Sequence, residues 1–170
     1  KLREGVPLQY LLGEWEFYGL TLKVGPGVLI PRPDTEILVD TALKKLENTQ
    51  NPAIADLCAG SGAIAIALAV SRPDASCTAV ELSEKAQEYL RENIARHRLQ
   101  ARITRQAADI HQTLPLEPLD LMISNPPYLS HDEMLCIPVQ VRHEPPMALE
   151  AEEDGMAFYP VLAQRGKELL

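Results

Sequence analysis

Cysteine is scarce in this sequence, and long apolar runs and targeting segments are missing. Among the 170 residues there are three cysteines. Cys58, Cys77 and Cys136 have no paired spacing, so they cannot supply a disulfide framework or a zinc site. A reducing cytoplasm is therefore the simplest setting. Because no apolar run is long enough to span a bilayer and nothing resembles a signal peptide, the sequence predicts a cytoplasmic protein that does not insert into membranes.

Histidine and basic residues are also limited. The four histidines show no metal-ligand spacing, so no metal site is expected, and there is no serine or cysteine nucleophile motif. The 16 lysine and arginine residues are outnumbered by 24 acidic residues, which gives a net charge of −8. Since duplex nucleic acids are bound by neutralising their phosphates with basic side chains, this balance argues against direct nucleic acid binding.

The composition is otherwise that of an ordinary soluble globular protein, with 46% hydrophobic and 24% charged residues. The length fits one domain with a sizeable core. Near the start, two alternating apolar runs, Trp15 to Phe17 and Leu20 to Val24, flank Tyr18 and Gly19. This pattern predicts a β-hairpin.

The chain is organised around the stretch from Leu119 to Tyr128, an apolar run closed by two prolines. Neither proline has an N–H for a strand ladder, so the stretch predicts a buried strand that ends at Asn125. Strand ends are where open α/β sheets bind ligands. There the Asn125 side-chain oxygen and the Pro126 carbonyl would be held stiffly, and Tyr128 offers a flat face, which suits a planar group with an N–H₂ donor. By itself the stretch fits equally well a turn in which Asn125 caps the next segment.

A second motif runs from Ile54 to Ala69. A short apolar strand containing Asp56 leads into a turn with Gly60 and Gly62 and then into an alanine-rich helix. Such a turn brings the backbone close to a ligand at a helix N-terminus. The glycines do not have the spacing of the dinucleotide fingerprint, and Asp56 is a further difference. The motif therefore predicts a ligand-binding turn of another kind.

Strands and helices alternate after this turn. The expected strands are Ala53 to Leu57, Cys77 to Glu81, Ala101 to Gln106 and the one ending at Asn125, with helices from Ala63 to Ser71 and after Ser83. An acid at the end of the second strand is placed to accept both hydroxyls of a ribose, so Glu81 is a ribose-binding candidate. The alternative is an acid favoured by the dipole of the next helix, although Ser83 already fills its N-cap position.

Two segments outside these strands complete the pattern. Asp34 is a plausible N-cap for a helix with apolar residues at helical spacing, and Arg32 is held stiffly ahead of it between two prolines. From Ser130 to Gln140 no clean period is present, so a loop that covers a site is expected there.

The acid, the glycine-rich turn, the later acid at a strand end and Asn125 to Tyr128 together resemble the class I S-adenosylmethionine-dependent amino-methyltransferases. The segments Leu29 to Glu36 and Val141 to Pro145 narrow the resemblance to the HemK/PrmC family, protein-(glutamine-N5) methyltransferases acting on peptide-chain release factors. It extends from about Gly5 to the end of the chain. Asn-Pro-Pro-Tyr alone is shared with enzymes that methylate exocyclic amines of nucleic acid bases, so the proline-arginine-proline segment is the more specific signal.

The resemblance implies an α/β fold, a Rossmann-like class I methyltransferase sheet preceded by a β-hairpin, with S-adenosyl-L-methionine as the cofactor. Residues 1–30 would form a leading segment and the hairpin, which link to an absent N-terminal helical domain. Residues 31–170 would form the catalytic domain without its C-terminal strands. The chain is thus expected to be truncated at both ends, and its protein substrate would be a peptide-chain release factor.

The resemblance also implies roles for individual residues. The cofactor-binding set is Asp56, Cys58, Ala59, Gly60, Ser61, Gly62, Glu81, Asp109, Ile110 and Asn125. The catalytic set is Asn125, Pro126, Pro127 and Tyr128. Within the first set, Asp109 would accept a hydrogen bond from the adenine amino group and Ile110 would pack on the ring. Cys58 stands where the family usually has glycine, which places a side chain against the cofactor turn.

Two other functions stay open. The first is an amino-methyltransferase acting on adenine, cytosine or guanine in nucleic acid. The second is a non-catalytic module that binds the cofactor or a partner, suggested by Cys58 and by the expected truncation.

Overall fold

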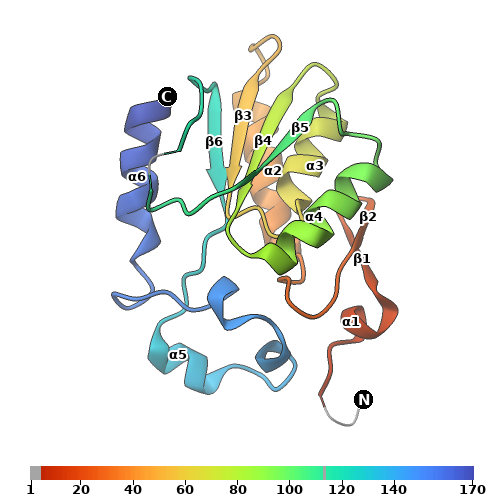
Figure 1. Cartoon of the computed structure of the whole chain (residues 1–170), viewed down its shortest axis with the longest axis vertical. Coiled ribbons are helices and arrows are strands. Elements are labelled where there is room, and N and C mark those ends of the chain that lie inside the picture. The colour runs from red at the N-terminus through yellow and green to blue at the C-terminus, as the bar shows by residue number, and fades with distance from the viewer. Residues whose placement is uncertain (1–4, 113) are drawn as a thin grey trace.

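The computed structural model describes residues 5–112 and 114–170. Residues 1–4, at the start of the expected leading segment, lie outside the described residues. The central element is a parallel sheet of four strands in the order β5-β4-β3-β6 (Figure 1). These strands are β3 (Ala53–Leu57), β4 (Ser76–Glu81), β5 (Ile103–Ala107) and β6 (Leu121–Ser124). The α/β class and the four predicted strands are confirmed, with β5 beginning two residues later than expected.

The strand order creates a switch point beside β3. The chain proceeds outward from β3 to β4 and β5, then returns to place β6 on the other side of β3. Leu57 pairs with Val80 of β4 on one side and with Ser124 of β6 on the other, so these three strands end at the same edge. Open α/β sheets bind ligands in the crevice at such a point.

Helices cover both faces of the sheet. On one face lie α2 (Glu36–Lys45), α3 (Ala63–Ser71) and α4 (Glu84–Arg96), and α6 (Phe158–Leu169) lies on the other (Figure 1). Successive strand residues point to opposite faces, so Ile54 packs with the first group and Ala55 with α6. Because α3 is apolar on all sides, it is buried from Ala63 to Ala69.

The predicted hairpin is present and packs on this core. It consists of β1 (Glu14–Phe17) and β2 (Leu20–Lys23), and it follows the short helix α1 (Leu8–Leu12). Its two turn residues, Tyr18 and Gly19, both have positive φ, 53° and 70°. Such values define the tight turns whose twist matches that of two paired strands.

Two expectations about local structure are wrong. Asp34 does not cap α2, because Pro33–Thr35 form a 3₁₀ turn and Thr35 precedes the helix without a side-chain cap. The stretch after Ser130 is not wholly a loop, because it contains α5 (His131–Cys136). Ser130 and Glu133 form a capping box that begins this helix. Two 3₁₀ turns follow, η3 (Val141–His143) and η4 (Pro146–Ala148).

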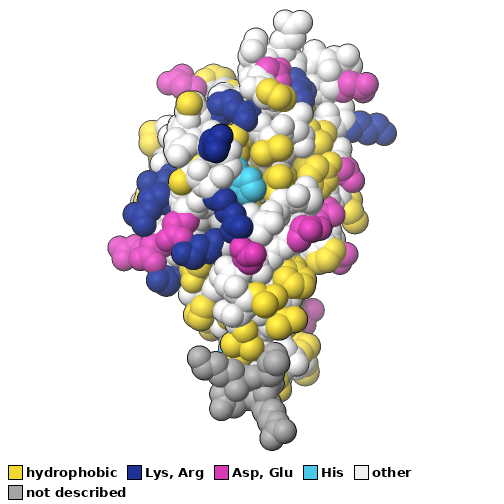
Figure 2. All heavy atoms as spheres, turned by 90° about the vertical axis from the view of Figure 1, so that its right-hand side faces the viewer, with side chains coloured by type: hydrophobic (Ala, Val, Ile, Leu, Met, Phe, Trp, Pro, Cys, Tyr) yellow, Lys and Arg dark blue, Asp and Glu magenta, His cyan; other side chains and the backbone are white. Residues whose placement is uncertain are grey.

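Charged side chains are mixed over α4 and the hairpin. In Figure 2, basic and acidic side chains lie next to one another on this face. Three ion pairs account for part of the pattern: Lys23 with Glu92, Arg96 with Glu14, and Lys85 with Glu88. The basic residues of α4 therefore form a solvated face balanced by acids.

Candidate active site

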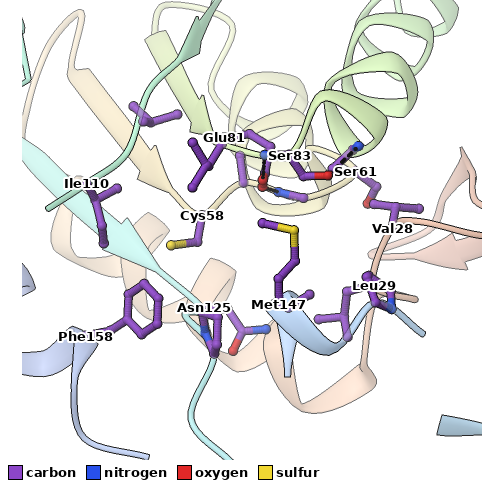
Figure 3. Close-up of a pocket in the computed structure, with 18 of the residues that line it drawn as sticks. Val28, Leu29, Cys58, Ser61, Glu81, Ser83, Ile110, Asn125, Met147 and Phe158 are labelled. Carbon is purple, nitrogen blue, oxygen red and sulfur yellow. Dashed lines mark hydrogen bonds between the residues drawn. The ribbon is translucent and has the colours of Figure 1, made fainter. Parts of the chain in front are cut away.

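A cavity of about 510 Å³ opens at the carboxyl ends of the strands (Figure 3). Its lining comes from the turn after β3, the ends of β4 and β6, and the loop after β5. It is completed by the segment before α2, the loop before α6 and the start of α6. The lining includes eight of the predicted cofactor-binding residues: Cys58, Ala59, Gly60, Ser61, Glu81, Asp109, Ile110 and Asn125. Pro127 lines it as well.

The turn after β3 has a backbone that favours glycine. Cys58, Gly60 and Gly62 have φ values of 62°, 56° and 84°. A Cβ on Gly60 would meet no atom within 4 Å, which leaves this peptide accessible to a ligand. A Cβ on Gly62 would lie 2.4 Å from Cδ1 of Leu90, so Gly62 lets α4 pack closely against the turn. Gly62 thus supports the cavity without lining it.

Asp56 lies beneath the turn and does not line the cavity. Its side chain is 1% exposed, and its Oδ2 accepts a hydrogen bond from the backbone N–H of Ala65 (3.1 Å). Oδ1 has no hydrogen-bond partner among the described residues. Burial raises the pKa of Asp56 to about 7, with the nearby Glu81 charge acting in the same direction. Asp56 therefore links the end of β3 to the start of α3 through this hydrogen bond and lies on the side of the turn away from the cavity.

Glu81 is fixed by the backbone around it. Its Oε2 accepts a hydrogen bond from the Gly60 N–H (2.7 Å), and its Oε1 accepts one from the Ser83 N–H (2.8 Å). Each carboxylate oxygen still has a lone pair for another donor. The carboxylate at the end of β4 is consequently held in one orientation at the cavity, as binding of a ribose diol would require.

The loop after β5 forms another part of the lining. Asp109 Oδ1 accepts a hydrogen bond from the His111 N–H (2.9 Å), which lowers the pKa of the Asp109 carboxyl. Arg165 of α6, which the sequence analysis did not single out, donates from Nε to the Ile110 carbonyl (3.1 Å). Phe158 packs edge-on against His111, with 5.1 Å between ring centroids. Helix α6 therefore fixes the loop that carries Asp109 and Ile110.

Asn125 follows β6 directly and faces the cavity (Figure 3). Its Nδ2 donates to Oγ1 of Thr35 (3.4 Å), which leaves its side-chain oxygen available to accept a hydrogen bond. Pro126 is buried and does not line the cavity. Tyr128 is 53% exposed and is also absent from the lining. The roles assigned to these four residues stay predictions, and the cavity brings together Asn125 and Pro127.

Cys58 lies at the centre of the turn with its thiol packed against apolar neighbours. Burial, together with the nearby Glu81 carboxylate, raises the pKa of this thiol to about 12. A thiol that stays protonated at neutral pH is a poor nucleophile. Within residues 5–112 and 114–170, no group of three or more His, Cys, Asp or Glu side chains could hold a metal ion.

Much of the opposite side of the cavity is formed by residues that no sequence motif marks. Val28 and Leu29 border it from the segment before α2, and Met147 and Phe158 approach from later parts of the chain (Figure 3). These are apolar residues without a motif of their own. Leu29 lies within one of the two segments that narrowed the family resemblance, and Val28 and Met147 lie close to these segments, whereas Phe158 has no such signal. Across the part of the chain that the structure describes, no helix has the length and apolar character to cross a bilayer.

Comparisons with known proteins agree with this architecture. The chain is 42% identical over 165 residues to a release factor glutamine methyltransferase of Streptococcus pneumoniae, covering 96% of this chain and 58% of that protein. A protein of the same name from Bordetella pertussis is 44% identical over 154 residues, covering 90% and 56%. The chain thus spans between half and two thirds of the length of these two curated relatives.

The fold is also found among solved structures. The crystal structure of the hMettl16 catalytic domain, in complex with a MAT2A 3′UTR hairpin, superposes with a TM-score of 0.72 at 18% identity. It covers 89% of this chain and 58% of that chain. The Methyltransferase small domain family matches residues 33–141, which include the glycine turn, Glu81 and Asn125. With the class I methyltransferase fold and this match over most of its length, the chain belongs to the Methyltransferase small domain family.

Proposed function

We propose that this chain carries the catalytic domain of a methyltransferase that uses S-adenosyl-L-methionine to methylate the side-chain amide nitrogen, N5, of a glutamine in a peptide-chain release factor. The observation that carries the proposal is the placement of Asn125 in the same cavity as the Cys58 to Ser61 turn and Glu81. Among the described residues, no donor is bonded to its side-chain oxygen. The names of the curated relatives support the choice of substrate.

The chain's own residues fit the proposed cofactor. A volume of about 510 Å³ is within the range of small-molecule and cofactor sites. Glu81 offers two fixed acceptors for the ribose hydroxyls. Ile110, with Val80 and Phe158 around the same cavity, offers apolar surface for a purine ring. Gly60 leaves room for a ligand to approach the turn backbone.

The residues near Asn125 would orient the target amide. When bound, S-adenosyl-L-methionine supplies a methyl group already activated on a sulfonium, so positioning matters more than acid or base strength. An amide nitrogen is a weak nucleophile, because its lone pair is delocalised into the carbonyl. Acceptance of one of its N–H hydrogens by the Asn125 oxygen would direct the nitrogen and favour electron density on it. Orientation of this kind can contribute roughly 7–11 kcal/mol to a transfer step.

A methylation assay with isotopically labelled cofactor tests the proposal. Full-length protein is incubated with a release factor bearing Gly-Gly-Gln, with the same factor carrying alanine in place of that glutamine, and with ribosomal RNA and DNA. We expect label in the first substrate alone, and mass spectrometry should place one methyl group on the glutamine side chain. Label in RNA or DNA with none in the release factor would instead establish a base methyltransferase.

A binding measurement separates the non-catalytic alternative. Calorimetric titration with S-adenosyl-L-methionine should show one site. Binding without turnover on any of the four substrates would indicate a cofactor-binding module and contradict the proposed transfer.

A further inference from the structure

Glu144 is a buried carboxylate outside the main cavity. Its side chain is 3% exposed. Oε2 accepts a hydrogen bond from the Ile30 N–H (2.9 Å), and Oε1 accepts one from Nη2 of Arg32 (2.5 Å). Glu144 lines a separate cavity of about 300 Å³ and does not line the main one, so any effect that it has on the main cavity is indirect.

The two segments joined by Glu144 both border the main cavity. Val28, Leu29 and Pro31 come from the segment before α2, and Pro145 and Met147 come from the loop that begins at Glu144. Figure 3 shows Leu29 and Met147 bordering the same cavity on ribbons from these two distant parts of the chain. Glu144 is therefore a direct link between two parts of one wall.

The segment before α2 is also held on its other side. Tyr10 of α1 is buried, and its hydroxyl donates to the Val28 carbonyl (2.5 Å). Burial raises the pKa of Tyr10, and the Glu144 charge raises it further, so this hydroxyl keeps its proton at neutral pH. Val28 and Ile30 are thus anchored by two different side chains, and Glu144 joins the start of the loop from Pro145 to Ala148 to this segment.

The ion pair compensates for an unfavourable burial. A carboxylate removed from water is strongly destabilising unless it is paired and hydrogen-bonded. Arg32, whose side chain is 35% exposed, supplies the charge, and the Ile30 N–H supplies a second donor. Removal of one partner from such a pair leaves the other buried without compensation. Without Arg32, the free energy would fall if Glu144 moved toward water, and this movement would withdraw Met147 from the cavity wall.

We propose that Glu144 and Arg32 form a positioning pair that sets the affinity for S-adenosyl-L-methionine by holding the loop from Pro145 to Ala148 against the segment from Val28 to Pro31. The inference deepens the proposed function and rests on it. Neither residue is assigned contact with the cofactor or the target amide. Their effect is exerted through Leu29, Pro31 and Met147, which line the cavity.

Calorimetric titration with S-adenosyl-L-methionine on four versions of the full-length protein tests the pair. These are the wild type, Arg32→Gln, Glu144→Gln and the double variant. Each single variant should weaken binding roughly tenfold. Because the two groups are in direct contact, the loss of affinity in the double variant should be much smaller than the product of the two single losses. If the loss of affinity in the double variant equals the product of the two single losses, the residues act independently, and this result would overturn the pairing.

Hydrogen exchange gives a second readout that a general loss of stability would not reproduce. In the wild type the Ile30 amide should be protected. Glu144→Ala should lose that protection while the core amides of β3 keep theirs, whereas Arg32→Gln should retain part of it because the Glu144 carboxylate still accepts from Ile30. Equal loss at Ile30 and in β3 would mean that the whole fold is weakened, and this result would overturn the inference.

Arg72→Gln is the matched control. Arg72 also binds an acid, Asp74, and donates to the Leu46 and Thr49 carbonyls, but it lies at the C-terminal end of α3, away from the cavity. Its loss should lower Tm without changing cofactor affinity. A wild type that binds no S-adenosyl-L-methionine would overturn the proposed function and the inference with it. Unchanged affinity in Glu144→Gln and Arg32→Gln, beside a wild type that binds, would overturn the inference alone.

Discussion

The two sides of the main cavity are held in place by different means. On the sheet side, the glycine turn directly follows β3 and Glu81 is the last residue of β4. The Glu81 carboxylate accepts hydrogen bonds from backbone groups two residues along the chain and in the turn after the adjoining strand. On the loop side, Leu29 and Met147 belong to segments joined by Glu144, whose partners are 112 and 114 residues away in sequence. One side is fixed by the core and the other by a few long-range side-chain contacts.

This difference determines what a substitution should do on each side. Changes on the sheet side act on groups that we propose meet the cofactor or the target amide, or on the packing of the core beneath them. Changes on the loop side remove part of a wall and leave the core intact. We therefore expect substitutions on the sheet side to change turnover, cofactor affinity or the free energy of unfolding, and substitutions on the loop side to change cofactor affinity modestly.

The largest effect is expected for Asn125→Ala. The variant removes the acceptor proposed for the target amide, and loss of one positioned polar group from a transition state lowers turnover by about 10²–10³. Affinity for S-adenosyl-L-methionine should stay within a few-fold. Asn125→Asp should be milder, because it keeps an acceptor oxygen at the same place. Steady-state kinetics on the glutamine-bearing substrate, with calorimetry for the cofactor, provide the measurement. Wild-type turnover in both variants would reduce Asn125 to a strand-end cap.

Glu81→Ala should have the next largest effect. It removes both proposed ribose acceptors, and a hydrogen bond to a charged group contributes roughly 1.5–3 kcal/mol. Affinity for S-adenosyl-L-methionine should fall at least tenfold in a calorimetric titration. Glu81→Gln serves as the control, since it retains one acceptor oxygen and should lose less. Equal affinity in the wild type and Glu81→Ala would remove the ribose assignment.

The sheet side could largely be predicted from the sequence because its signals are local. The apolar runs, the glycine turn and Ser83 at the start of α4 specify strands, a turn and a helix with little help from the rest of the chain, and Ser83 does accept from the Ala86 N–H. The positions of Glu81 and Asn125 at the cavity then follow from the rule that parallel strands end at a common edge.

The loop side could not be predicted because its signals are tertiary. Arg32 alone looks like a solvent-facing residue between prolines, and only its contact with Glu144 gives it a structural role. Helix α5 is different, because its capping box is a local signal, Ser130 followed three residues later by Glu133, from which the start of this helix was predictable. For Tyr128, the sequence suggested a wall of the site, whereas this side chain is exposed and outside the cavity lining.

Two glycines of the same turn should respond unequally to alanine. Both have positive φ, so each substitution introduces left-handed strain, but only at Gly62 would the new Cβ overlap another side chain, that of Leu90. Gly62→Ala should therefore lower the free energy of unfolding by about 1–3 kcal/mol more than Gly60→Ala, the usual cost of overpacking. Urea denaturation measures the difference. Equal losses would show that Leu90 moves aside freely and that the turn is less tightly packed than described.

Met147→Ala tests the loop side directly. Met147 is 51% exposed and lines the cavity, so its truncation removes apolar surface that would contact the proposed cofactor, worth about 1 kcal/mol, or roughly fivefold in affinity. The free energy of unfolding should not change. Met156→Ala is the matched control, because Met156 is 54% exposed and does not line the cavity. A loss of stability in Met147→Ala comparable to that in Gly62→Ala would erase the contrast between the two sides.

The smallest effect concerns the stability of two variants at position 58. There we expect glycine to be more stable than alanine, which is the reverse of the usual order. At most positions alanine is more stable than glycine, because glycine loses more backbone entropy on folding. Cys58 has a φ of 62°, where a Cβ is strained by about 1–2 kcal/mol. Cys58→Gly relieves that strain, whereas Cys58→Ala keeps it and also loses the packing of the thiol. The glycine variant should therefore be the more stable of the two by about 1 kcal/mol in urea denaturation.

Cys77 supplies the comparison for this reversal. Cys58 is partly buried, whereas Cys77 is fully buried, at 3% exposure, and lies within β4 in extended backbone. Cys77→Gly should be less stable than Cys77→Ala, the opposite order from position 58. If alanine were the more stable substitution at both positions, the left-handed backbone at Cys58 would impose no measurable strain, and the turn would tolerate a side chain there as readily as glycine.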